Sequence, residues 1–176
     1  MQEVSLVLTV LGPDQPGVVE RLAGWIAARE GNWLESRMCR LGGEFAGILR
    51  CRLPADRQPA LRDSLRELEA AGFAVEMKPD PGHARGGGRV IALELVGQDR
   101  PGIVREISGA LARQGINVEE LSTGCESAPM SGEPLFRAAL QAWLPEGCDL
   151  EKLRADLERI AADLQVDVSF DPAPEG

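Results

Sequence analysis

The chain has very little of the side-chain chemistry on which most enzymes depend. Its 176 residues include no tyrosine and one histidine, His83. That histidine lies in a segment rich in proline and glycine, where we expect it to be solvated. The four cysteines, at positions 39, 51, 125 and 148, match no C-x-x-C metal or redox spacing. Metal ligation and histidine-based acid–base catalysis are therefore disfavoured. We expect that the chain is not an enzyme and binds no cofactor.

The chain also lacks a basic stretch and a long apolar run. Its net charge is −9, divided into −1 for residues 1–88 (11 basic, 12 acidic) and −8 for residues 89–176 (8 basic, 16 acidic). DNA binding needs cationic surface that displaces counterions, so direct nucleic-acid binding is disfavoured. No segment reads as a signal peptide or reaches the roughly 20 apolar residues of a membrane span. We therefore expect a cytoplasmic chain with reduced thiols and no membrane contact.

What the chain does have is a duplicated turn. The segment Gly12-Pro13-Asp14-Gln15-Pro16-Gly17 returns as Gly97-Gln98-Asp99-Arg100-Pro101-Gly102, at an offset of 85 residues. The same offset relates the apolar positions that follow the turn, and then Asn32 to Asn117. A fixed period with matched flanks indicates two copies of one module.

Apolar periodicity predicts the order β-α-β-β-α-β in both copies. In the first copy we expect strands at 4–11, 33–41, 45–53 and 73–78, with a helix after the turn and a second helix that Asp56 caps. In the second copy we expect strands at 90–96, 117–125, 135–144 and 166–170, and helices at 103–113 and 150–164. We predict an α+β chain with two ferredoxin-like domains, each a four-stranded antiparallel sheet with two helices on one face. The domains are placed at 1–79 and 89–172, with a linker at 80–88.

The turn has the chemistry of a small-anion site. Its glycines let a ligand approach the main chain, and the helix that follows presents N–H groups and a positive dipole end. The first helix is expected to begin at Pro16 and to end at Gly31-Asn32. Asn32 and Asn117 offer both a donor and an acceptor, as an amino acid requires. The alternative is that Asp14 and Asp99 only cap helices and the glycines only form tight turns.

Other functions and surfaces remain open. Val18 and Val19 stand where a P-loop needs Lys and Ser or Thr, which excludes that motif. Acylphosphatases pair a turn arginine with a strand asparagine, which Arg100 and Asn117 imitate. The cluster Arg37, Arg40, Arg50 and Arg52 predicts either an ion-paired sheet face or a docking surface for the acidic second half. We expect Ile91 and Leu93 on the uncovered face of the second sheet, and therefore a homo-oligomer.

The turn resembles that of the ACT domain, a small regulatory module that binds amino acids. The segments Gly31-Asn32-Trp33-Leu34-Glu35-Ser36-Arg37-Met38 and Leu41-Gly42-Gly43-Glu44-Phe45 are similar to the first ACT domain of the glycine cleavage system transcriptional repressor family. The segment 128–136 resembles the long second hairpin of that family. The resemblance implies ligand-binding residues at Gly12, Asp14, Gly17, Asn32, Gly97, Asp99, Gly102 and Asn117. It also implies a ligand site where two ACT domains meet. The first copy has Gly31-Asn32 where the second keeps Gly115-Ile116-Asn117, so one residue of the usual spacing is expected to be missing.

The resemblance implies a regulator without catalysis. It would respond to a small amino acid, glycine first, and control transcription of glycine cleavage genes through contact with an activator protein. Two alternatives remain: an interaction-only ACT protein that binds no ligand, and an acylphosphatase-like hydrolase.

Overall fold

The chain forms two compact units, residues 1–83 and 84–176. The computed structural model describes residues 2–82, 86–127 and 134–172, with the backbone alone described for residues 170–172. His83, part of the predicted linker and part of the predicted long hairpin lie outside the described residues. No helix in the described ranges is long and apolar enough to cross a membrane.

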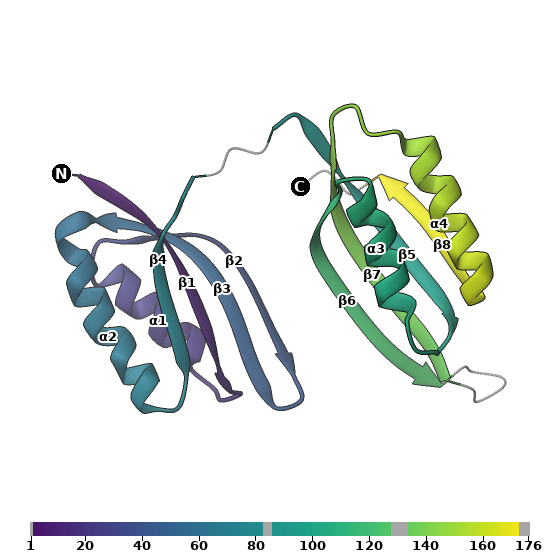
Figure 1. Cartoon of the computed structure of the whole chain (residues 1–176). Coiled ribbons are helices and arrows are strands. Elements are labelled where there is room, and N and C mark those ends of the chain that lie inside the picture. Colours follow the sequence, from purple (N-terminus) through teal and green to yellow (C-terminus); the bar gives the residue numbers. More distant parts are fainter. Residues whose placement is uncertain (1, 83–85, 128–133, 173–176) are drawn as a thin grey trace. The chain divides into compact units, whose positions relative to one another are not determined.

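The first unit has the predicted β-α-β-β-α-β order, with one extra 3-10 turn (Figure 1). Its elements are β1 (Glu3–Pro13), α1 (Val18–Ala27), β2 (Asn32–Leu41), β3 (Glu44–Pro54), η1 (Ala55–Arg57), α2 (Gln58–Ala70) and β4 (Ala74–Pro79). The strands form an antiparallel sheet in the order β2-β3-β1-β4. The first and last strands of the unit therefore lie side by side.

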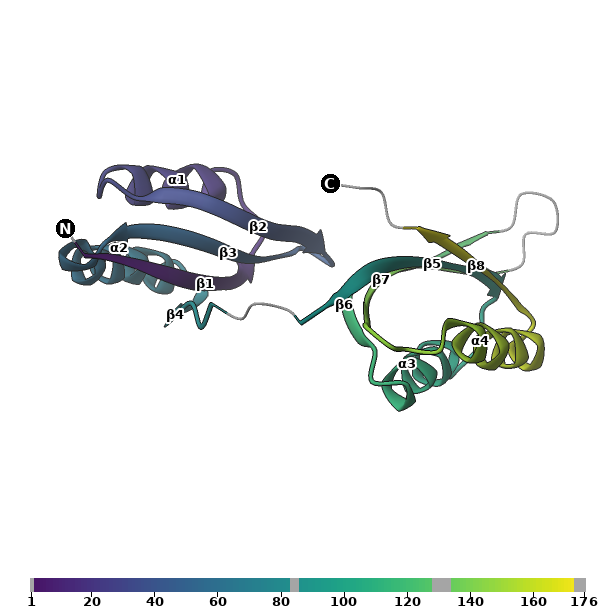
Figure 2. The same cartoon turned by 90° about the horizontal axis from the view of Figure 1, so that it is seen from above.

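The second unit repeats this arrangement. Its elements are β5 (Gly88–Gln98), α3 (Ile103–Arg113), β6 (Asn117–Ser127), β7 (Pro134–Pro145), α4 (Leu150–Leu164) and β8 (Val166–Pro172). The sheet order is β6-β7-β5-β8, again antiparallel. Figure 2 shows α3 and α4 on the concave face of this curved sheet. The two units confirm the α+β prediction of two ferredoxin-like domains.

The duplication extends to an irregularity of the edge strands. The pairing of β2 with β3 shifts between Trp33 and Glu35, which leaves Leu34 as an extra residue. The pairing of β6 with β7 shifts between Val118 and Glu120, so Glu119 is the extra residue, 85 positions later. The two units thus share a β-bulge as well as a topology, and positions related by this offset occupy equivalent places along these strands.

Each core lies between one sheet face and the two helices. In the second unit, Ile91 and Leu93 are buried in this core at 6% and 1% exposure. The expectation that they lie on the uncovered face is therefore wrong. A run of alternating residues in a central strand does not say which face is covered, and here the odd-numbered positions face the helices.

The uncovered face of the first sheet carries the exposed apolar residues. Leu11 is 49% exposed, Ile48 is 47% exposed and Leu41 is 81% exposed. Leu11 on β1 lies opposite Ala46 on β3, and Thr9 lies opposite Ile48, so this face is continuous across neighbouring strands. Open apolar surface on an uncovered sheet face is therefore found at these residues of the first sheet and not at Ile91 and Leu93.

Two predicted helix starts are wrong. Helix α1 begins at Val18 and not at Pro16. Gly17 lies between them with a left-handed φ of 89°, which no residue within a right-handed helix adopts. Asp56 lies within η1, and α2 begins at Gln58 without a side-chain cap. The cap that does form, at α4, is Asp149, whose carboxylate accepts from the Lys152 amide at 3.0 Å.

The expectation that a residue is missing before Asn32 is also wrong. Both first helices end in the same hydrogen-bond pattern, with Gly31 N–H donating to Ile26 O and Ile116 N–H donating to Leu111 O. The left-handed residue of this pattern is Glu30, with φ 58°, in the first unit and Gly115, with φ 70°, in the second. The spacing is therefore equal in the two copies. They differ in residue type at the left-handed position and at the next one, which is Gly31 in the first unit and Ile116 in the second.

Candidate functional site

The first glycine of each turn is fixed by packing inside its own domain. A Cβ on Gly12 would lie 2.5 Å from Cδ1 of Phe73, and a Cβ on Gly97 would lie 2.6 Å from Cα of Val166. The space beside these glycines is filled by the chain itself, at the start of the last strand of each domain. Gly12 and Gly97 thus set the close approach of two strands.

The last glycine of each turn opens the helix onto free space. Gly17 and Gly102 have φ of 89° and 102°, and a Cβ on either would meet nothing within 4 Å. Each precedes a helix start that no side chain caps. The amide groups of the first helical turn therefore face outward beside an open backbone, the arrangement that suits a carboxylate.

The first turn carboxylate is held by an arginine. Arg40 Nε on β2 donates to Oδ2 of Asp14, and the Asp14 amide donates to Gly43 O at 2.9 Å. These contacts fasten the turn to the tip of the β2–β3 hairpin. Because the carboxylate is engaged in this ion pair, the alternative that Asp14 caps α1 is wrong.

The second turn carboxylate has a neutral partner instead. Cys125 on β6 is equivalent to Arg40 by the 85-residue offset, and its thiol hydrogen-bonds Asp99. Desolvation, the charge of Asp99 and this hydrogen bond all raise the pKa of Cys125, so the thiol stays protonated. The Asp99 amide donates to Pro134 O at 3.1 Å, which keeps the turn in the same place as in the first domain.

The second turn also carries its own guanidinium. Arg100 Nη2 donates to Oε1 of Gln165, the left-handed residue that ends α4 beside Gly97. In the first domain Gln15 takes the place of Arg100. Gly72 takes the place of Gln165, because it is left-handed and precedes the residue that packs on Gly12, and neither Gln15 nor Gly72 carries a charge. The two turns therefore share a backbone frame and differ in where their positive charge lies.

The two candidate asparagines do not join the turns of their own domains. Gly12 lies opposite Phe45 on β3, whereas Asn32 lies opposite Arg52. The separation along β3 is seven residues, or roughly 23 Å at about 3.3 Å per residue. Figure 1 shows β2 running toward the hairpin tip, so Asn32 lies at the far end.

The second domain has the same separation. Gly97 lies opposite Phe136 and Asn117 opposite Trp143, again seven residues apart along β7. Arg100 and Asn117 therefore lie at opposite ends of the domain. This arrangement removes the acylphosphatase-like pair, which needs both residues at one oxyanion.

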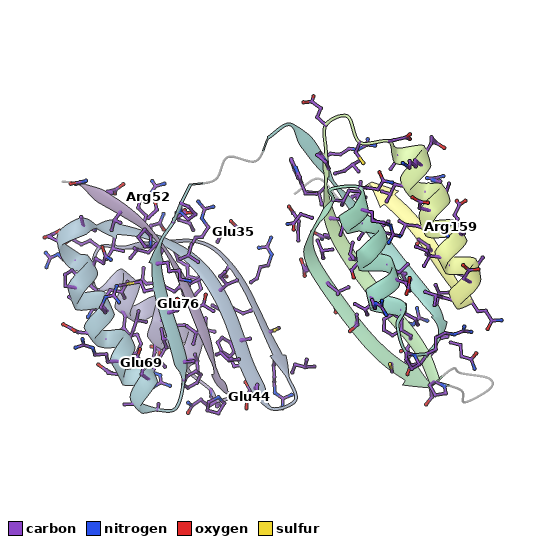
Figure 3. The ribbon with its side chains drawn as sticks, in the orientation of Figure 1. Glu35, Glu44, Arg52, Glu69, Glu76 and Arg159 are labelled. Carbon is purple, nitrogen blue, oxygen red and sulfur yellow. The ribbon has the colours of Figure 1, made fainter. Side chains whose placement is uncertain are left out.

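The arginine cluster is an ion-paired surface within the first domain. Arg50 Nη2 lies 2.8 Å from Oδ2 of Asp80, and its Nη1 lies 3.3 Å from Oε2 of Glu35. Arg52 lies near Glu3 at 3.9 Å. Glu35 and Arg52 are labelled in Figure 3. These pairs confirm the interpretation of an ion-paired sheet face, and the docking hypothesis has no support from them.

A small apolar crevice lies beside the second turn. It has a volume of about 20 Å³, between the first turn of α3 and strands β6 and β7, and is lined by Leu95, Ile103, Val104, Ile107, Ser108, Val118, Leu121, Phe136, Ala138 and Leu140. In the first domain Met38 packs against the core, and its Cγ would lie 3.1 Å from a Cβ on Gly47. The space in the second domain is the size of one water molecule.

Sequence reasoning missed Arg40 and Cys125 as neighbours of the turns. In the sequence Arg40 stands among other arginines, and Cys125 matches no metal or redox spacing, so neither position alone points to a turn. The signal was present, because the offset of 85 that relates the turns also relates these two positions. In the part of the chain that the structure describes, no group of three metal-ligating side chains comes together.

The comparisons with known proteins agree with this architecture. The ACT domain model matches residues 5–78, and a second ACT domain model matches residues 91–138. A crystal structure of an unknown protein from Galdieria sulphuraria is 29% identical, with 97% of this chain and 98% of that chain covered and a TM-score of 0.86. A crystal structure named "putative glycine cleavage system transcriptional repressor" is 21% identical, with the same coverage and a TM-score of 0.71. No curated protein matches the chain. Its two matched domains, which share one fold and one turn, show that the chain belongs to the ACT domain family and carries two ACT domains in tandem.

Proposed function

We propose that this chain is a non-enzymatic regulator that senses a small amino acid, glycine first. We further propose that it controls transcription of glycine cleavage genes by contacting an activator protein in the cytoplasm. The observation that carries the proposal is the pair of ACT turns, each with a left-handed glycine that opens a helix onto free space. The name of the similar 21% identical structure suggests the glycine cleavage genes.

The mechanism is a shift between arrangements of the protein. A ligand that binds one arrangement better than another changes their populations by its differential affinity. The partner then binds only the favoured arrangement. The net charge of −9 supports action through a protein partner, since phosphates would be repelled by the acidic surface.

The separation of the asparagines bears on how a ligand site is completed. Asn32 and Asn117 lie roughly 23 Å along the sheet from the turns of their own domains. We propose that a second copy of the chain supplies the asparagine that faces a turn. This requires a homo-oligomer, and the exposed Leu11, Ile48 and Leu41 are apolar residues that association would bury.

Calorimetry with each of the twenty amino acids tests the proposal. We expect heat of binding with glycine, and a thermal midpoint that rises with its concentration. At ligand about 100-fold above its dissociation constant, one site adds about 2.7 kcal/mol to the free energy of unfolding. Each kcal/mol raises the midpoint by roughly 2–4 °C in a chain of this size. If no amino acid binds at millimolar concentration, the interaction-only alternative replaces this proposal.

A further inference from the structure

The equivalent carboxylates of the two turns have different neighbours. Asp14 is ion-paired with Arg40, whereas Asp99 faces the uncharged Cys125 thiol and makes no ion pair within the described ranges. The frames around them match, because both turns are tied to their hairpin by the aspartate amide and both end in a left-handed glycine. The difference therefore comes from one side chain on the neighbouring strand.

The second turn carries a guanidinium, a group that pairs well with carboxylates. Arg100 is held by the amide oxygen of Gln165, which uses one of the five N–H donors of the guanidinium. Asp99 and Arg100 together offer an acceptor for an ammonium group and donors for a carboxylate. In the first turn Gln15 replaces the guanidinium, and the existing ion pair already uses the carboxylate.

The packing beside the turns also differs between the two domains. The second turn adjoins an apolar crevice of about 20 Å³ at Ile103 and Phe136. In the first domain Met38, on the strand equivalent to β6, packs against the core. The crevice is apolar and has room for about one water molecule.

We propose that only the second turn binds the small amino acid, with Asp99 receiving its ammonium group and Arg100 its carboxylate, while Arg40 closes the first turn. This inference rests on the proposed function and names which copy acts. The residue at the position of Arg40 and Cys125 determines whether a turn is open. The ligand class is a glycine-sized zwitterion.

The test installs the closing arginine in the second turn of the full chain. Cys125→Arg places a cation opposite Asp99, and we expect the affinity for glycine, measured by calorimetry, to fall roughly tenfold or more. Ser122→Arg is the matched control, because it adds the same charge to the same strand on the other face, opposite Ala139. We expect Ser122→Arg to bind glycine as the unchanged protein does.

A second variant removes the carboxylate without adding charge. Asp99→Asn keeps the shape of the turn, and we expect it to lose glycine binding while its circular dichroism and unliganded thermal midpoint stay close to those of the unchanged protein. The unchanged protein should bind one glycine per chain.

Three outcomes separate this inference from the proposed function. Two equivalent glycines per chain, or full binding retained by both Cys125→Arg and Asp99→Asn, would overturn the assignment to the second turn and leave the proposed function standing. Absence of binding by every amino acid to the unchanged protein would overturn both.

Discussion

At the scale of single residues, the structure separates glycines that look alike in the sequence. Gly12 and Gly97 are required by the chain's own packing, whereas Gly17 and Gly102 are required by their backbone angle and face open space. All four were candidates for ligand contact on the turn motif alone. A motif records which residues recur, and it does not record whether a ligand or a neighbouring strand fills the space beside them.

Gly12→Ala should destabilise the first domain. Its Cβ would lie 2.5 Å from the Phe73 ring and 3.0 Å from the Phe73 Cα, so backbone as well as side chain must shift. We expect a loss of about 1–3 kcal/mol in the free energy of unfolding, measured by urea denaturation. Gly24→Ala, in α1 with nothing within 4 Å of the added Cβ, should instead stabilise by about 0.5–1 kcal/mol. Equal effects of the two changes would contradict the packing argument.

Cys51 should make the first domain less stable at alkaline pH. Its side chain has no exposed surface, and burial raises its pKa to about 11. The unfolded thiol titrates near pH 8.5, so between about pH 8.5 and 11 only the unfolded chain loses the proton, and stability falls as pH rises. Denaturation midpoints at several pH values should fall less steeply for Cys51→Ala than for the unchanged protein. Parallel slopes would show that Cys51 does not contribute.

At the scale of elements, the order of strands and helices follows from apolar periodicity, but the helix ends do not. The start of α1 depends on the left-handed Gly17, and its end depends on Glu30 in a conformation that favours glycine. Nothing in the residue type of Glu30 indicates a positive φ. The distance between Asn32 and its own turn does not follow from the sequence for a different reason. It depends on the pairing of β2 with β3, which places Asn32 at the end of the sheet away from the turn. The sequence therefore names candidate residues for the site but does not give their arrangement.

Glu30→Gly should stabilise the first domain. A left-handed conformation costs a non-glycine residue roughly 1–2 kcal/mol, and the exposed pair with Arg57, at 3.4 Å, contributes less than this. We expect a gain of up to about 1 kcal/mol in the free energy of unfolding. Glu30→Ala, which removes the ion pair and keeps the left-handed strain, should show no gain.

In the second domain, replacement of the left-handed glycine should have the opposite effect. Gly115 has φ 70° at the equivalent position. Gly115→Ala should lower stability by about 1 kcal/mol, measured in the same denaturation experiment. An unchanged midpoint would mean that the helix end rearranges at no cost.

At the scale of the whole molecule, charge and exposed apolar surface give opposite expectations for two kinds of partner. The chain has net charge −9, and it leaves Leu41 81% exposed at the tip of the first hairpin. We expect the net charge to disfavour nucleic acid and the exposed Leu41 to favour association with a protein surface.

Light scattering should show that the protein is at least a dimer at tens of micromolar. Leu41→Glu and Ile48→Glu place charge on the apolar part of the first sheet, and we expect the doubly substituted chain to shift toward the 18.9 kDa monomer. The purified chain should not shift duplex DNA in a gel at physiological salt. A monomer before substitution, or a sequence-specific shift at submicromolar protein, would contradict these expectations.

The pairing of the first strand of each domain with its last has a consequence for synthesis on the ribosome. Leu6 and Leu8 pair with Pro79 and Met77, residues that emerge some seventy positions later. Until β4 has been made, one edge of β1 has no partner and can pair with another chain. Such non-local closure is slow, because loop-closure entropy is lost before the contacts form. A nascent chain stalled before residue 74 should therefore aggregate or recruit chaperones, whereas one long enough for β4 to have left the ribosome should already contain a closed first domain.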